Sequence, residues 1–398
     1  MVQGSRPADS AFTVKVSPRG AARLKDGHVW VYRSDIVSAN DAPPGSVVSV
    51  TDHRGQFLGT ALYSSSSQIA VRLISRDAVK DFPALLRQRV ADALAYRERV
   101  VRDTDAYRVI FSEGDFLPGI VVDRYADILS LQILTQAVDA EAVREVLLAE
   151  LTERLSPSSI VERVDPRVRD LESRPPKESG LLRGEKRSTI VTMNGVQFHF
   201  DALTGQKTGA FLDQRENYSA AAQYGRGEAL DVFCYQGGFS LHLAERCTQV
   251  AGVDSSRPAL EVADRNAALN GREIEWIEAN AFDLLKDYSV SGKQYDTIVL
   301  DPPAFAKSKK ELEAAMRGYK ELNLRALKML RPGGILVTCS CSYHVRQSDF
   351  LEMLAGAALD AHREVRLVEV RGQSKDHPAL VNVPETGYLK CVIGCVSY

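Results

Sequence analysis

Two short motifs in the second half of the chain combine residue types that could do covalent chemistry on a flat ring. One runs from Asp301 to Phe305 (DPPAF), and the other runs from Thr338 to Ser342 (TCSCS). Each follows an apolar stretch that is typical of a buried strand. Paired prolines form a rigid, extended turn that lacks N–H donors, which suits a wall against which a planar base is held. A thiol beside such a wall could act as a nucleophile.

The thiol indicates one particular kind of chemistry. It could add to C6 of a pyrimidine, which makes C5 nucleophilic enough to accept a methyl group from a sulfonium. A base must then remove the C5 proton before the thiol can leave. Cys339 and Cys341 could share one side of a strand because successive side chains alternate. We favour Cys341, which lies further toward the open end of the strand, and interpret the cysteines at 234, 247, 391 and 395 as buried small apolar residues.

Polar residues after three successive expected strands indicate a bound cofactor. Asp231 opens the stretch DVFCYQGGFS, in which Gly237 permits a tight turn that can wrap a ligand carrying an amine and a carboxylate. Asp254 follows the next strand and could accept both hydroxyls of a ribose. Asn280 follows the third strand, where an amide could receive an adenine amino group. The G-x-G-x-x-G spacing of a dinucleotide fingerprint is absent from this stretch.

The elements that must position these motifs alternate between strand and helix from about residue 228 onward. Apolar strands are expected at 229–234, 249–253, 274–277, 297–300 and 335–339, with helices between them. Such alternation predicts an α/β, Rossmann-like parallel sheet with helices on both faces and ligands at the carboxyl ends of its strands. The cofactor residues, the proline motif and the thiol are therefore expected at one cleft.

The first half of the chain is organised differently. Short strands broken by turns at 11–80 predict a small all-β barrel, and a helix at 82–101 leads into an α+β segment. The stretch 169–187 lacks periodicity and is predicted to be a surface loop. We therefore predict three domains, at 1–80, 81–190 and 191–398.

Charge and composition narrow the choice of partner and compartment. The formal net charge is −2, but residues 1–80 carry ten Lys and Arg against six Asp and Glu, a surplus that permits RNA binding without demanding it. No apolar run is long enough to cross a membrane, and no secretory signal is evident. The six cysteines are too sparse for a disulfide framework, so a cytoplasmic protein is expected. No metal site is expected, and a homodimer is one of the oligomeric states left open.

Taken together, the motifs make the chain resemble the bacterial large-subunit ribosomal RNA cytosine-5 methyltransferase family. That family joins an N-terminal PUA domain to a class I methyltransferase domain. The resemblance implies S-adenosylmethionine as the cofactor and 23S ribosomal RNA as the partner. The matching segments span nearly the whole chain: 27–32, 112–119, 122–125, 207–215, 231–240, 253–256, 301–305, 318–323 and 340–342.

The resemblance also implies roles for individual residues. Cys341 would be the nucleophile, with Asp301 and Glu385 as further catalytic candidates. Glu385 lies in a segment similar to the closing segment of the related 5-methyluridine enzymes, where the acid removes the proton. The chain departs from the family in carrying Asn280 where relatives often have Asp, and in a second thiol at Cys339. The cofactor candidates are Phe211, Asp213, Arg215, Asp231, Phe233, Tyr235, Gly237, Asp254, Ser255, Asn280, Ala281 and Asp301, and the RNA-contact candidates are Lys207, Pro302, Phe305 and Tyr319.

Three other activities are weighed against cytosine methylation. They are methylation of uridine C5, methylation of an exocyclic amine of a purine, and RNA binding in ribosome assembly without catalysis. The DPP sequence with Phe305 argues against the amine chemistry. The intact set of Asp231, Asp254 and Cys341 argues against a chain without catalysis.

Overall fold

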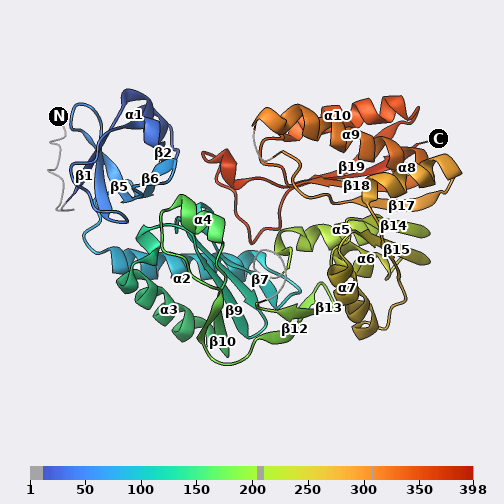
Figure 1. Ribbon diagram of the computed structural model, residues 1–398, viewed down its shortest axis with the longest axis horizontal. Helices are drawn as coiled ribbons and strands as arrows, with labels where there is room; N and C mark the ends of the chain where they lie inside the picture. The colour runs from blue at the N-terminus through green and yellow to red at the C-terminus, as the bar shows by residue number, and fades with distance from the viewer. Residues whose placement is uncertain (1–11, 204–209, 307–308, 398) are drawn as a thin grey trace. The chain divides into compact units, whose positions relative to one another are not determined.

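The computed structural model describes residues 12–203, 210–306 and 309–397 (Figure 1). The chain divides into two units. The first comprises Met1–Thr189, Phe200–Ala210 and Lys375–Thr386, and the second comprises Ile190–His199, Phe211–Ser374 and Gly387–Tyr398. Both units are therefore built from separate stretches of the chain.

The first unit begins with a six-stranded sheet of order β2-β6-β5-β4-β1-β3. Alternating Val14 and Val16 pack with Val48 and Val50 in its core. A helix that the strand pattern did not predict, α1 (Pro18–Lys25), follows β1 because Ser17 caps it through a 3.1 Å bond from Gly20 N to Ser17 Oγ. The strands are β1 (Thr13–Val16), β2 (Trp30–Tyr32), β3 (Ile36–Ser38), β4 (Val47–Thr51), β5 (Phe57–Tyr63) and β6 (Ile69–Ser75).

A second sheet in the same unit has the order β11-β10-β9-β8-β7. Leu86 and Val90 of one helix and Leu147 and Leu151 of another share a core with its strands. The predicted loop at 169–187 is wrong in part, since β11 lies within it and pairs antiparallel with β10. The elements are α2 (Phe82–Val100), β7 (Ala106–Phe111), β8 (Ile120–Tyr125), β9 (Ile128–Ile133), α3 (Glu141–Leu155), β10 (Ser159–Glu162), α4 (Pro166–Leu171) and β11 (Gly180–Arg183).

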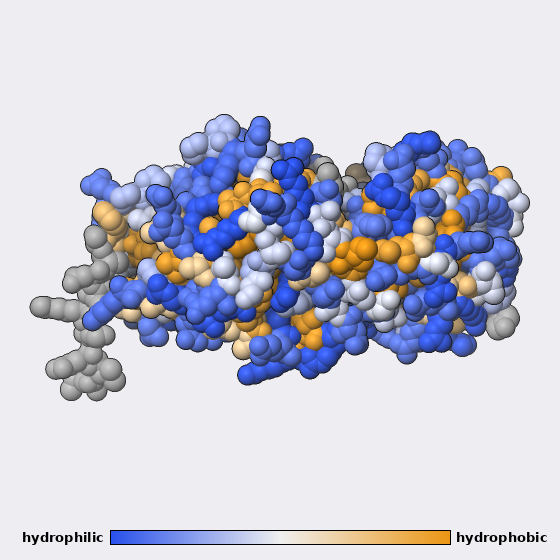
Figure 2. Space-filling view, turned by 90° about the horizontal axis from the view of Figure 1, so that it is seen from below, coloured by the Kyte–Doolittle hydropathy of each residue, from blue (hydrophilic) through white to orange (hydrophobic). Residues whose placement is uncertain are grey.

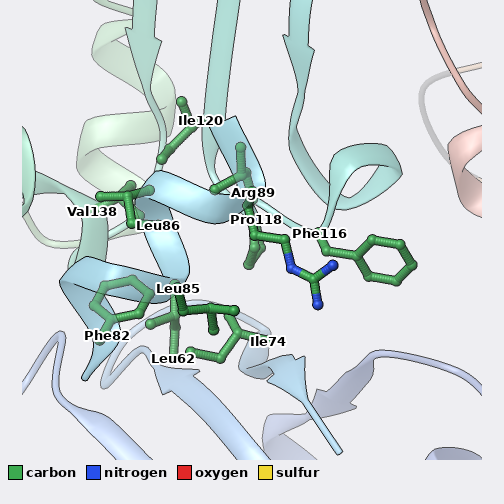
Figure 3. A pocket seen from close by; sticks show the side chains of 11 residues that line it. Leu62, Ile74, Phe82, Leu85, Leu86, Arg89, Phe116, Pro118, Ile120 and Val138 are labelled. Carbon is green, nitrogen blue, oxygen red and sulfur yellow. The ribbon is translucent and has the colours of Figure 1, made fainter. Parts of the chain in front are cut away.

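An apolar pocket lies in this first unit (Figure 3). Arg89 is the one charged residue of its lining, and its guanidinium carbon lies 5.1 Å from the ring centroid of Phe116. No thiol or carboxylate lines the pocket, so the chemistry expected above must lie elsewhere. The lining residues are Leu62, Ile74, Phe82, Leu85, Leu86, Arg89, Phe116, Leu117, Pro118, Ile120 and Val138.

A hairpin of β12 (Ser188–Met193) and β13 (Val196–Asp201) contributes to both units. Its two-residue turn consists of Asn194 and Gly195, with φ of 51° and 85°. Asn-Gly tolerates positive φ at both positions, which is the conformation that a tight hairpin turn needs.

The second unit contains a seven-stranded sheet of order β16-β15-β14-β17-β18-β20-β19. The strands up to β18 are mutually parallel, as expected, and β20 runs antiparallel to both of its neighbours. The strand order reverses between β14 and β17, which is the point where open α/β sheets bind ligands. The strands are β14 (Glu228–Val232), β15 (Gln249–Asp254), β16 (Glu275–Glu278), β17 (Tyr295–Leu300), β18 (Leu330–Ser340), β19 (Val365–Arg371) and β20 (Lys390–Val396).

Helices cover both faces of this sheet (Figure 1). One core joins the sheet to α8 (Ala281–Ser291), α9 (Leu312–Met329) and α10 (Gln347–Asp360). The opposite core includes residues of α5 (Arg215–Tyr224) and α6 (Gly238–Leu243), and α7 (Arg257–Leu269) lies on the same side. The central strands are apolar on both faces for this reason. The arrangement confirms the expected α/β fold class.

The surface shows no continuous apolar belt on the face drawn in Figure 2, where hydrophobic residues form separate patches among hydrophilic ones. In the described part of the chain, no helix is both long enough and apolar enough to cross a membrane.

Candidate active site

The turn after β14 has an unusual backbone. Phe233, Tyr235 and Gly237 all have positive φ, at 68°, 50° and 85°. The left-handed region disfavours residues other than glycine, and such residues cluster at functional sites, where surrounding bonds hold them. Here the amide of Tyr235 donates to Oδ2 of Asp254 at 2.9 Å, which links the turn to the end of β15. Alternate left-handed residues point backbone N–H groups into a concave turn that can hold a ligand.

Asp231, at the base of this turn, is completely buried. Its Oδ2 accepts bonds from the amide and the hydroxyl of Ser240, at 2.9 and 2.6 Å. Its Oδ1 is buried and has no hydrogen-bond partner among the residues that the structure describes. Burial raises the pKa of this carboxyl to about 7. A buried oxygen that lacks a donor fits a cationic amine supplied by a ligand.

The next two strand ends carry residues that are already engaged with backbone amides. Asp254 accepts from Ser256 N at 2.8 Å through Oδ1, in addition to its bond with the turn, and Ser255 is exposed beside it. Asn280 caps α8, since its Oδ1 accepts from Phe282 N at 2.9 Å, and buried Ala281 opens that helix. The carboxylate and the amide are thus held in place at the sheet edge.

The short helix η4 (Leu212–Gln214) borders the turn. The ring of Phe211 meets that of Tyr235 edge-on, with centroids 5.1 Å apart. Asp213 is buried and its Oδ2 accepts from the hydroxyl of Tyr388 at 2.5 Å. Arg215 is also buried, so these two charged candidates lie inside the unit and not at its surface. Lys207 lies outside the described residues.

Gln214 connects η4 to the end of β17, and the sequence analysis missed it. Its Nε2 donates to Oδ1 of Asp301 at 2.9 Å, while its Oε1 accepts from Asn217 at 2.7 Å. The amide therefore orients the carboxylate of Asp301. The only sequence signal was its position beside Asp213 and Arg215.

The proline motif and the thiol meet at adjacent strand ends. β17 and β18 are parallel neighbours with Leu300 opposite Thr338, so the residues that follow them share an edge. Cys341 is half-buried there, and its Sγ lies 3.9 Å from the carbonyl oxygen of Pro302. The buried Pro302 thus forms one wall of the thiol's surroundings.

Aromatic residues support this edge from beneath. Tyr319 is completely buried, and its hydroxyl lies 2.9 Å from Oγ of Ser342, the residue after the thiol. Ser342 Oγ also accepts from Ala306 N at 3.2 Å. The half-buried ring of Phe305 lies against Tyr319, with centroids 4.8 Å apart. Tyr319 therefore orients the loop, and Phe305 is the ring nearer the surface.

The two neighbouring thiols differ in their surroundings. Cys339 is completely buried on β18 opposite Cys391 of β20. Burial, followed by hydrogen bonding with Cys391, holds the pKa of Cys339 well above its ordinary value, so this thiol stays protonated. Cys341 comes after the last strand residue and is only half-buried.

Lys390 is a second residue that the sequence analysis missed. Its ammonium is buried and donates to the carbonyl oxygens of Ser342 and Tyr388, each at 2.7 Å. Burial lowers the pKa of Lys390 to about 8. The sequence signal was a single lysine at the start of an otherwise apolar stretch, KCVIGCV.

Glu385 lies in the first unit, whereas Cys341 lies in the second. It belongs to η6 (Pro384–Thr386), and its Oε2 lies 3.1 Å from Nε2 of His28. Within the described ranges, no cluster of three or more His, Cys, Asp or Glu side chains could hold a metal ion.

The sheet order, the glycine turn after β14 and the acidic residues at Asp231 and Asp254 define a class I S-adenosylmethionine-dependent methyltransferase domain. Comparison with known proteins agrees. Residues 124–387 match the S-adenosylmethionine-dependent methyltransferase family, and residues 14–76 match the PUA-like domain.

Relatives extend over the whole chain. Ribosomal RNA large subunit methyltransferase I of Shewanella denitrificans is 39% identical over 97% of this chain and 100% of its own length. The Photobacterium profundum protein of the same name is 39% identical over 92% of this chain and 95% of its own. A solved Streptococcus mutans structure, titled as a SAM-dependent methyltransferase, shares the fold at 20% identity with a TM-score of 0.82, over 96% of this chain and 99% of that one.

The chain therefore belongs to the S-adenosylmethionine-dependent methyltransferases, and within them to the family of ribosomal RNA large subunit methyltransferase I. The expected pairing of a PUA-like domain with a methyltransferase domain is confirmed, and so is the expected cofactor, S-adenosylmethionine. The buried Oδ1 of Asp231, which lacks a donor in the described part of the chain, fits the amine of that cofactor.

Proposed function

We propose that this chain transfers a methyl group from S-adenosylmethionine to C5 of a cytosine in 23S ribosomal RNA, through a covalent bond between Cys341 and C6. The observation that carries the proposal is the half-buried thiol of Cys341 beside the carbonyl of Pro302, at the same sheet edge as Asp254. The names of the relatives support ribosomal RNA as the substrate, and such a substrate implies action in the cytoplasm.

The proposed reaction has three steps: addition of the thiolate, transfer of the methyl group, and release of the thiolate. The thiolate of Cys341 adds to C6, and the electrons of the C5–C6 double bond make C5 nucleophilic. S-adenosylmethionine, when bound, supplies the methyl group from its sulfonium and leaves as S-adenosylhomocysteine. A base then takes the C5 proton, the C5–C6 double bond re-forms and the C6–S bond breaks, which returns the thiolate.

Two carboxylates are candidates for that base. Asp301 lies at the same sheet edge as the thiol and is held by Gln214. Glu385 lies beside His28 in the first unit. Either assignment is a proposal, and replacing each by its amide distinguishes them. Loss of the true base leaves the methylated adduct attached to the protein, because the thiol cannot leave before the proton does.

The RNA side of the site is proposed in the same way. The target base must leave its stack to reach the thiol. Pro302 and Phe305 would hold its faces, and Lys207 would contact a phosphate. The PUA-like part would recognise folded RNA largely by shape and backbone contacts. The proposed active species is a monomer or a homodimer, which sedimentation of the full-length protein would distinguish.

Substitution of the two thiols tests the covalent step. We expect Cys341→Ala to abolish methyl transfer while retaining RNA and S-adenosylhomocysteine binding, and Cys339→Ala to retain transfer because that thiol is buried and protonated. RNA carrying 5-fluorocytidine should form a stable adduct with the unaltered protein and with Cys339→Ala, but none with Cys341→Ala. Unchanged transfer by Cys341→Ala would reject covalent catalysis.

Mass mapping of ribosomal RNA from cells with and without the protein tests the target atom. We expect one cytosine in 23S RNA to lose its C5 methyl group when the protein is absent. A methyl group on C5 of uridine or on a purine amine would replace the proposed substrate. Unchanged methylation with altered ribosome assembly would favour the alternative without catalysis.

A further inference from the structure

Lys390 has surroundings that its role as a strand residue does not explain. It opens β20 and lies opposite Ser340 of β18, the residue before the proposed nucleophile. Its side chain is 6% exposed, and its ammonium donates to the carbonyl oxygens of Ser342 and Tyr388. Strand pairing thus places Lys390 opposite the residue before Cys341, and the bond to Ser342 ties its ammonium to the residue after Cys341.

The ammonium has no carboxylate partner for an ion pair among the described residues. The negative charges of Cys341 and Asp349 each raise the pKa of Lys390, whereas burial, which has the larger effect, lowers it. Asp349 is engaged at the start of α10, where its Oδ2 accepts from Arg346 N at 3.1 Å. Of these two groups Cys341 has the larger effect on the pKa of Lys390, and the ammonium is bonded to the carbonyl of Ser342, the residue that follows this thiol.

A buried cation without an anion costs free energy, whereas two carbonyls could be held equally well by a neutral donor. The cost is offset when the neighbouring thiol ionises, because each charge then favours the other. Such a pairing would raise the fraction of thiolate at neutral pH, and the thiolate is the form of a cysteine that acts as a nucleophile.

We propose that Lys390 is a positioning residue that stabilises the thiolate of Cys341 and holds its loop through the carbonyl of Ser342. The proposal rests on the proposed role of Cys341 and adds the group that activates it. Lys390 does not contact the reacting carbon, and its two bonds to carbonyls leave it unsuited to taking the C5 proton. Its charge acts on the nucleophile alone.

The pH dependence of Cys341 alkylation tests this. The rate of reaction with iodoacetamide is followed at Cys341 by peptide mass spectrometry, with the full-length protein across neutral and alkaline pH. We expect Lys390→Met to lower the rate at neutral pH about tenfold and to move the midpoint up by about one pH unit, because a shift of one pKa unit changes the thiolate fraction tenfold. At high pH, where the thiol is ionised in both proteins, the rates should converge.

Two controls separate charge from packing. Lys390→Arg keeps the charge and should restore the midpoint. Lys320→Met removes a partly exposed lysine of α9 that pairs with Asp360, and should leave the profile unchanged. If Lys390→Met changes the rate by one constant factor at every pH, Lys390 is only a tether and the proposal is wrong. If Cys341→Ala retains methyl transfer while the midpoint still moves in Lys390→Met, the proposed catalysis fails but the pairing of the two charges stands.

Discussion

Asp231 is a carboxyl group that burial keeps protonated well above its ordinary range, with a pKa of about 7. Ser240 supports one of its oxygens, and the other faces no donor among the described residues. A cationic ligand that supplies this donor should favour the ionised form. In the unliganded protein the raised pKa lowers the stability at higher pH. Between pH 3.8 and about 7 the folded state holds a proton that the unfolded state has lost, so the free energy of unfolding falls as pH rises.

We therefore expect the affinity for S-adenosylhomocysteine to weaken as pH falls below about 7, approaching tenfold per pH unit, because protonation of Asp231 competes with the ligand amine. Isothermal titration across this range would measure it. Asp231→Asn should bind more weakly and lose this dependence, and it should also remove the fall in unfolding free energy with pH. An identical pH dependence in the variant would show that another group titrates.

At the scale of elements, the turn between β14 and α6 depends on Gly237. Its φ is +85°, and an added Cβ would lie 2.9 Å from Cη2 of Trp276. We expect Gly237→Ala to cost about 1–2 kcal/mol of unfolding free energy from the left-handed backbone alone, and to weaken S-adenosylhomocysteine binding about tenfold or more because the turn must shift. Urea unfolding and ligand titration would measure the two effects.

Gly292 provides a matched control for that substitution. It also has a left-handed φ, +76°, but ends α8, where an added Cβ would meet nothing within 4 Å. Gly292→Ala should therefore show a similar loss of stability with unchanged ligand affinity. Equal losses of affinity in both variants would mean that the effect comes from general destabilisation and not from the turn.

At the scale of the whole molecule, the connection between β19 and β20 leaves the unit to which both strands belong. Residues Lys375–Thr386 form part of the first unit, where Val383 is completely buried in the core of the N-terminal sheet. The flanking residues Ser374 and Tyr388 both bind Asp213 in the second unit, at its carbonyl and its carboxylate. One short connection is thus anchored in each unit separately.

We expect Val383→Ala to destabilise the first unit by about 1–3 kcal/mol, the cost of removing buried methyl groups. Hydrogen exchange of peptides from β4 and β5 should become faster, while S-adenosylhomocysteine affinity stays unchanged. Val381→Ala is the control, since Val381 is 97% exposed and should change neither measurement. Weaker binding of the ligand in the Val383 variant, without faster exchange, would contradict this assignment of the segment.

Local pattern predicted much of the second unit. The alternation of apolar strands with helices determines the parallel sheet, because each strand must bury both faces and each helix one. Residues at the carboxyl ends of parallel strands meet by topology, so Asp254, Asp301 and Cys341 could be placed at one edge without coordinates. The left-handed residues Phe233 and Tyr235 lie in the turn that the sequence indicated. The glycines of that turn did not predict that these two residues would also have positive φ.

The sequence by itself thus determined the family, the cofactor and the order of the motifs along the chain. Only the tertiary structure decided which side chains from distant parts of the chain meet and which are buried. Lys390 bonds to the carbonyl of Ser342, beside Cys341, because antiparallel pairing sets residue 390 opposite residue 340. Gln214 reaches Asp301 across the same sheet edge. Val383 is buried and Val381 exposed although both are valines two positions apart. Such contacts depend on strand register and packing between distant segments, which no local pattern of residue types encodes.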